Sequence, residues 1–135
     1  MTAQLDLLQR NRPRKARPAL EVRTHIALAD LLALDAAPGW ICTHYPLGEF
    51  RTEKTGALLK RMGNKPGFFD WLLIGPDGTH HWMEIKRGAA PLTPAQKYFQ
   101  IQMNMRGVPC AVARSFRDAE TQLKAWGVLR GRVSA

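Results

Sequence analysis

Residues 68–86 read FFDWLLIGPDGTHHWMEIK, two apolar segments joined by a turn, and this stretch decides the fold. Pro and Asp suit the two central positions of a type I turn, and Gly suits the left-handed position that follows them. Pro76-Asp77-Gly78 supplies these residues in that order. The stretch therefore predicts an antiparallel hairpin.

The length of the hairpin loop determines which residues face each other across the two strands. A two-residue loop would place Asp70 opposite Met83, so that it would face away from Glu84. A three-residue loop that includes Gly78 places Asp70 directly opposite Glu84, with Cβ atoms about 5 Å apart. We expect the three-residue loop, because each turn residue then occupies a position that suits it.

Glu84 and Lys86 lie two residues apart on the second strand, so their side chains point to the same face. Together with Asp70 they offer two carboxylates for a divalent cation and an ammonium for a phosphate. The alternative is an exposed polar stripe in which Glu84 and Lys86 form a weak ion pair. Residues 68–74 weigh against this alternative, since they read as a strand buried on both faces, where a lone carboxylate is costly.

Composition limits the class of protein. The chain has 135 residues, which suits one domain, and 20 Lys and Arg against 11 Asp and Glu give a formal charge of +9. This charge favours a polyanion such as nucleic acid, although many soluble proteins are as basic. Cys42 and Cys110 form neither a disulfide framework nor a zinc motif, and no signal peptide or membrane span is evident. We expect a cytoplasmic protein with no membrane partner.

The remaining elements follow from hydrophobic spacing and capping signals. Helices are predicted at residues 19–34, 52–62, 94–106 and 115–126, and further strands at 40–44 and 108–113. Thr93-Pro94-Ala95-Gln96 supplies an N-cap, a first-turn proline and a capping-box glutamine. In the second helix, Leu58, Leu59 and Met62 form the side expected to be buried. The resulting order is helix, strand, helix, two strands, helix, strand, helix, which is an α/β fold.

The first 18 residues are predicted to be an extended basic arm, because Pro13 and Pro18 interrupt a helix there. Its cations are Arg10, Arg12, Arg14, Lys15 and Arg17. The arm either contacts phosphates or is a solvated tail, and the sequence favours neither.

No histidine metal site is predicted. His80 and His81 are adjacent and would point to opposite faces of a strand, so they cannot bind one ion together. His25 and His44 lack partners at ligand spacing. The four tryptophans are expected in the core, and Ser115 is expected to cap a helix.

Several of these motifs occur in the order that is typical of the VRR-NUC domain in the PD-(D/E)xK nuclease superfamily. They are Gly63, Pro66-Gly67-Phe68-Phe69-Asp70, the hairpin, Glu84-Ile85-Lys86, Leu92-Thr93-Pro94-Ala95-Gln96 and Gly107-Val108. The chain resembles this family over residues 21–126, with Phe69 standing where the superfamily name has proline. The resemblance implies a restriction-endonuclease-like core, a central mixed β-sheet flanked by helices, over residues 19–127, with residues 128–135 as a tail.

The resemblance also implies the residues of a nuclease centre. Asp70, Glu84, Lys86 and Gln96 would be catalytic, and Glu21, Asp70, Glu84 and the carbonyl of Ile85 would bind Mg²⁺ or Mn²⁺. Without the resemblance, Glu21 is explained as a carboxylate that stabilises the N-terminus of its helix, and Gln96 is explained as a capping residue. Nearby cations that could follow the DNA backbone are Arg51, Lys54, Lys60, Arg61, Lys65 and Arg87.

The function implied is that of a metal-dependent DNA endonuclease. Small stand-alone members of the family, from bacteria and phages, resemble Holliday-junction resolvases, so we expect selectivity for branched DNA and a homodimer. One alternative is a non-catalytic nucleic-acid-binding module of a repair or phage complex. Another is a restriction-type enzyme that reads a sequence, but the chain offers no identifiable specificity module.

Overall fold

The computed structural model describes residues 16–46 and 52–131. Its elements in chain order are α2 (Ala16–Asp35), β1 (Ile41–His44), α3 (Glu53–Arg61), β2 (Trp71–Ile74), β3 (His80–Ile85), α4 (Pro94–Met105), β4 (Cys110–Ala113) and α5 (Phe116–Ala125). This is the predicted order, so the α/β class is confirmed for the described residues.

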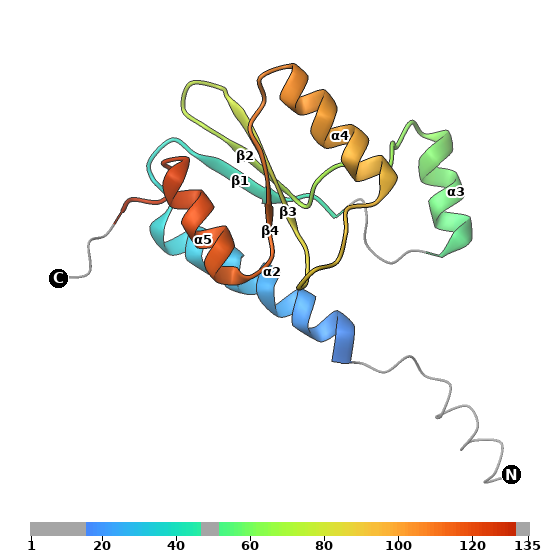
Figure 1. Cartoon of the computed structure of the whole chain (residues 1–135), viewed down its shortest axis with the longest axis horizontal. Coiled ribbons are helices and arrows are strands. Elements are labelled where there is room, and N and C mark those ends of the chain that lie inside the picture. The colour runs from blue at the N-terminus through green and yellow to red at the C-terminus, as the bar shows by residue number, and fades with distance from the viewer. Residues whose placement is uncertain (1–15, 47–51, 132–135) are drawn as a thin grey trace, which may run out of the picture.

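Within the described residues, four strands form one mixed sheet in the order β1-β2-β3-β4. Strand β2 pairs antiparallel with both β1 and β3, whereas β3 and β4 are parallel. A parallel pair needs a long crossover, and α4 supplies it. Figure 1 shows α4 on one face of the sheet and α2 with α5 on the other. The domain is therefore a three-layer arrangement of helix, sheet and helix.

The β2–β3 hairpin has the predicted three-residue loop. The N–H of Gly75 donates to the Thr79 carbonyl at 3.0 Å, and the N–H of Gly78 donates to the Gly75 carbonyl at 2.9 Å. Gly78 has φ +83°, a left-handed conformation that a side chain would strain. The ladder pairs Ile74 with His80 and continues to Trp71 and Met83, so the next pair in this register is Asp70 with Glu84.

Two hydrophobic clusters fix the hairpin, one on each face of the sheet. Trp71 packs with α2 and α5 in a cluster that includes Leu28 and Leu123. Phe69 packs with Trp82 and Phe99 on the α4 side, and its side chain is fully buried at 0% exposure. Asp70 therefore lies between two anchored aromatic residues that point into different layers.

Both predicted ends of the domain need correction. Helix α2 begins at Ala16, so residues 16–18 of the predicted arm are helical, and Pro18 fits because first-turn N–H groups have no helical partner. The predicted tail begins too early, since Val128 and Leu129 are buried. Gly127, with φ +76°, turns the chain back, and the Arg130 N–H donates to the Asp35 carbonyl at 2.8 Å. The arm cations Arg10, Arg12, Arg14 and Lys15 lie outside the described residues.

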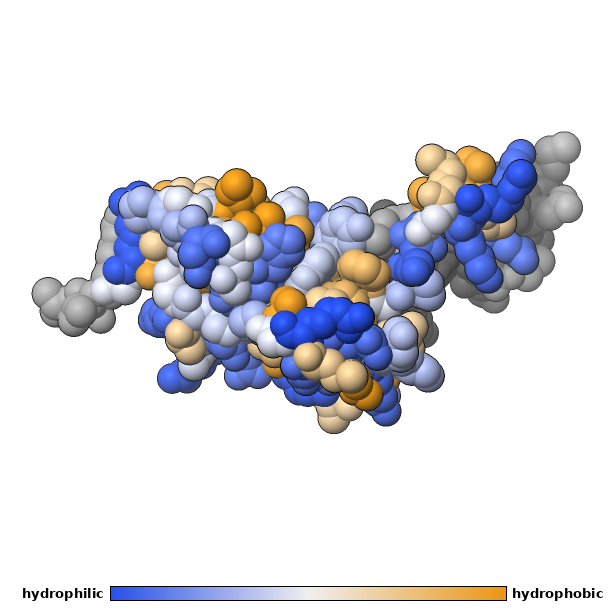
Figure 2. Space-filling view, turned by 90° about the horizontal axis from the view of Figure 1, so that it is seen from above, coloured by the Kyte–Doolittle hydropathy of each residue, from blue (hydrophilic) through white to orange (hydrophobic). Residues whose placement is uncertain are grey.

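Helix α3 stands apart from the rest of the domain (Figure 1), and none of its residues is buried. Leu58 is 55% exposed and Met62 is 72% exposed, so the prediction that this side is buried is wrong. Helix α3 has the expected amphipathic spacing, but such spacing does not specify what covers the apolar side. Figure 2 shows hydrophobic and hydrophilic residues side by side at this end of the molecule.

The two cysteines lie on opposite edge strands, Cys42 on β1 and Cys110 on β4, and both are free thiols. Burial raises the pKa of each thiol to about 11, which makes them poor nucleophiles. Among the helices of the described residues, none combines the length and the apolar character that crossing a membrane would require.

Candidate functional site

Asp70 and Glu84 meet where the β2–β3 ladder ends. The backbone N–H of Asp70 donates to Oε2 of Glu84 at 3.1 Å, and the backbone N–H of Ile85 donates to Oδ2 of Asp70 at 3.0 Å. Each carboxylate thus accepts a hydrogen bond from the backbone of the other segment. These reciprocal bonds hold the two carboxylates together at one end of the sheet.

The position of Glu84 is electrostatically strained. Glu84 is buried, with only 4% of its surface exposed. Burial and the charge of Asp70 raise the pKa of Glu84 to about 8, although the ammonium of Lys86 acts in the opposite direction. Without further positive charge, Glu84 therefore holds a proton at neutral pH. A divalent cation between the carboxylates would supply that charge and displace the proton, and paired carboxylates are the donors that Mg²⁺ and Mn²⁺ prefer.

Lys86 and Gln96 complete the surroundings of Glu84. Nζ of Lys86 lies 3.9 Å from Oε1 of Glu84, with the lysine side chain 18% exposed. Nε2 of Gln96 donates to the same Oε1 at 2.8 Å. Oε1 of Gln96 accepts from the Thr93 N–H at 2.9 Å, which forms the predicted capping box. Gln96 therefore caps α4 and contacts Glu84 with opposite ends of one amide.

A cavity of about 430 Å³ opens beside this group. Glu21, Ile85, Lys86 and Arg87 line it, so the predicted ligands Glu21 and Ile85 border the same space as the lysine. Arg114, also in its wall, donates to the Gly88 and Ala90 carbonyls at 3.0 and 2.6 Å and holds the loop that follows β3. The cavity can admit a phosphate-sized group next to Lys86.

The predicted DNA contacts separate into two places. Arg87 is exposed at the cavity. Lys54, Lys60 and Arg61 are exposed on α3, and Lys65 is exposed on the link that follows it. Arg51 lies outside the described residues. Among the predicted contacts that the structure describes, only Arg87 therefore lies at the candidate site, and most of the others are on the projecting helix.

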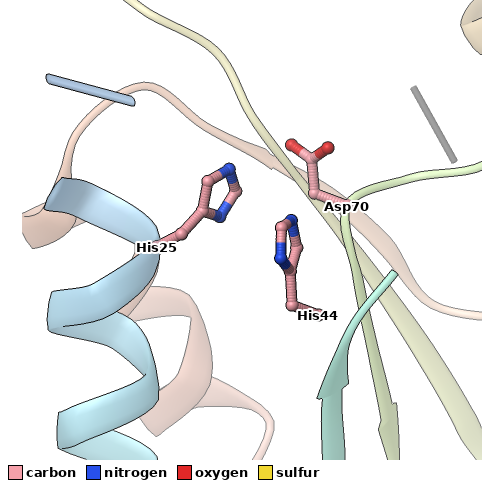
Figure 3. Close-up of side chains that lie close together, drawn as sticks. All are labelled: His25, His44 and Asp70. Carbon is pink, nitrogen blue, oxygen red and sulfur yellow. The ribbon is translucent and has the colours of Figure 1, made fainter. Parts of the chain in front are cut away.

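Sequence reasoning did not find a second group of residues, in which His25 and His44 lie on the other side of Asp70. One ligand atom each from His25, His44 and Asp70 lie within 4.8 Å of one another. The imidazoles are stacked with ring centroids 4.2 Å apart. Figure 3 shows both rings with a nitrogen turned toward the Asp70 carboxylate. No histidine metal site was predicted, because His25 and His44 lack partners at ligand spacing in the sequence, but the fold brings them together with Asp70.

The strand pairing explains why these residues meet. His44 pairs with Trp71 across β1 and β2, and the next N–H along the chain, that of Tyr45, donates to the Asp70 carbonyl. His25 lies one turn before the buried Leu28 on α2 and accepts a hydrogen bond at Nδ1 from Nε1 of Trp71, at 3.0 Å. An explicit antiparallel register for residues 41–44 against 71–74 would have placed His44 beside Asp70.

Comparisons of the chain with protein-family models, with curated proteins and with solved structures found no match. The case for a function therefore depends on the residues of the site and their geometry. Two features support a function. One is a carboxylate pair with a lysine, and the other is a pair of imidazoles with ring nitrogens within 4.8 Å of one of those carboxylates.

Proposed function

We propose that this protein is a nuclease that uses a divalent cation to hydrolyse phosphodiester bonds in DNA. The observation that supports this most strongly is the pairing of Asp70 with the buried Glu84, with Lys86 at 3.9 Å from Glu84. The mixed sheet and the resemblance of its motifs to the VRR-NUC domain are consistent with a restriction-endonuclease-like core.

Asp70 and Glu84 would hold Mg²⁺ or Mn²⁺, with the Ile85 carbonyl and Glu21 as further oxygen donors. The raised pKa of Glu84 supports this role, because burial and the charge of Asp70 disfavour the ionised carboxylate that a bound cation would stabilise. When bound, the cation neutralises phosphate charge and lowers the pKa of a coordinated water. Asp70 is fixed for this role because its N–H donates to the Glu84 side chain on β3 and its carbonyl accepts from the N–H of Tyr45, which directly follows β1.

Lys86 would bind the scissile phosphate and stabilise the charge that develops on it. Lys86 lines the cavity and its side chain is partly exposed, so a phosphate can approach it from solvent. Gln96 would act as a positioning residue, since its amide donates to Glu84 and is itself oriented by the α4 cap.

The distribution of positive charge supports DNA as the substrate. Exposed cations lie both at the cavity and on α3, which extends away from the sheet (Figure 1). One DNA could contact both sets of cations. The preference for branched substrates that we propose rests on the resemblance to the resolvase-like members of the VRR-NUC family. A homodimer would place two such centres on one branched molecule.

A second function is favoured by α3 itself. A basic helix with no buried residues suits a non-catalytic module that only binds nucleic acid. Such a module would bind DNA but would not require a carboxylate pair beside a lysine.

The test is cleavage of labelled branched, flapped and linear duplexes by purified protein with Mg²⁺, Mn²⁺ or EDTA. We expect cleavage with a divalent cation, and a loss of about 100-fold or more in Asp70→Asn and in Lys86→Ala. Asp30→Asn and Lys97→Ala change exposed residues outside the site and are the matched controls. Binding without cleavage would support the module, and cleavage that survives Asp70→Asn would refute the assigned centre.

A further inference from the structure

We infer that His25, His44 and Asp70 form a second cation site, which takes a first-row transition metal such as Zn²⁺ rather than Mg²⁺. The three residues come from α2, β1 and the link before β2, and the packing of these elements brings one ligand atom of each within 4.8 Å of the others. The inference shares Asp70 with the proposed nuclease centre, but it does not require that the protein cleave DNA.

The donor set determines the class of ion. Imidazole nitrogen suits Zn²⁺, Co²⁺ and Ni²⁺, whereas Mg²⁺ prefers oxygen donors and keeps several waters. Three protein ligands leave at least one position for water or substrate, which is the pattern of catalytic rather than structural zinc sites. Ligand atoms around zinc lie about 3.3 Å apart, given bonds of about 2.0 Å, so small side-chain movements would close the observed spacing.

Trp71 determines which ring nitrogen of His25 carries the proton. An indole N–H can only donate, so Nδ1 of His25 must accept and the neutral ring has its proton on Nε2. The Nε2 atom is therefore the nitrogen that His25 turns toward Asp70 in Figure 3. For Nε2 to bind a metal, the proton must move to Nδ1, where it would meet the N–H of Trp71.

Metal binding is thus coupled to the Trp71–His25 hydrogen bond. Two metal–nitrogen bonds outweigh one hydrogen bond, so the ion can displace it. Two consequences follow. Zn²⁺ should change the fluorescence of the buried Trp71, and Trp71→Phe should strengthen Zn²⁺ binding by about five-fold, because the competing donor is gone.

The first test titrates Zn²⁺ into the metal-free protein, without nucleic acid, by calorimetry. We expect one Zn²⁺ per chain, with affinity at least about 100-fold lower in His25→Ala and His44→Ala. His80→Ala is the matched control, since His80 is an exposed histidine on the hairpin. Glu84→Gln keeps all three proposed ligands and should retain binding, whereas Asp70→Asn should weaken it.

The second test needs no variant that might fail to fold. Nitrogen NMR of the histidine rings in the wild-type protein should show that Zn²⁺ shifts His25 and His44 but leaves His80 and His81 unchanged. Absence of Zn²⁺ binding, shifts confined to His80 or His81, or binding that survives both alanine substitutions would overturn the inference. Failure of DNA cleavage would count only against the proposed nuclease, because neither measurement involves DNA.

Discussion

The two sides of Asp70 are assembled in different ways. On one side, Glu84 is brought opposite Asp70 by a single hairpin, whose loop length sets the register. On the other side, His25 and His44 arrive from a helix and an edge strand that are distant in sequence. The carboxylate side therefore depends on local turn chemistry, and the imidazole side depends on how three separate elements pack.

This difference explains what the sequence could predict. The Pro76-Asp77-Gly78 turn contains enough information to place Asp70 opposite Glu84, and Thr93 with Gln96 contains enough to begin α4. Such features involve residues a few positions apart. The predicted element order was confirmed for the same reason.

What sequence reasoning missed depends on tertiary contacts. Val128 and Leu129 are buried because the chain turns back onto the end of α2 after Gly127, and no spacing signals that return. Leu58 and Met62 are exposed because nothing in the described residues covers α3. An apolar pattern indicates a face that can be buried, but not whether the chain itself supplies the partner.

The largest expected effect on stability comes from Phe69, whose buried ring anchors the chain beside Asp70. Phe69→Ala removes a fully buried ring that packs on Phe99, and we expect it to lower the free energy of unfolding by about 3–5 kcal/mol. Urea unfolding measures this change, with Leu58→Ala on exposed α3 as the control at about 0.5 kcal/mol or less. Equal losses in the two variants would refute the contrast between a buried anchor and a projecting helix.

The pH dependence of folding stability tests Glu84 separately from His25 and His44. The folded pKa of Glu84 is raised from 4.5 to about 8, so the folded protein binds this proton more tightly than the unfolded chain. The metal-free protein should therefore be most stable below pH 4.5 with respect to this group, and should lose up to ~4 kcal/mol as the pH rises to about 8.

Thermal or urea unfolding over this pH range measures the loss, and the difference between wild type and Glu84→Gln isolates it. Glu84→Gln carries no titrating group at this position, so its stability should vary less with pH. Parallel curves for the two proteins would show that the burial of Glu84 does not control its protonation.

Substitution of Gln96, which both caps α4 and contacts Glu84, should have a smaller effect on stability. Gln96→Ala removes both the cap bond to Thr93 and the bond to Glu84, and should cost about 1–2 kcal/mol of stability. Gln96→Glu keeps an acceptor for the cap but places a second carboxylate against Glu84. It should therefore retain α4 yet impair cation binding and cleavage, whereas a purely structural Gln96 would tolerate the change to Glu in both assays.

The central claim is that Asp70 and Glu84 together hold a divalent cation. Calorimetric titration of Mn²⁺ at pH 7 in two buffers of different ionisation enthalpy tests it directly, because bound Mn²⁺ must displace the proton of Glu84. We expect close to one proton released per Mn²⁺ by the wild type, with binding and release both lost in Asp70→Asn. Mn²⁺ binding that releases no proton, or that is unchanged in Asp70→Asn, would contradict the claim.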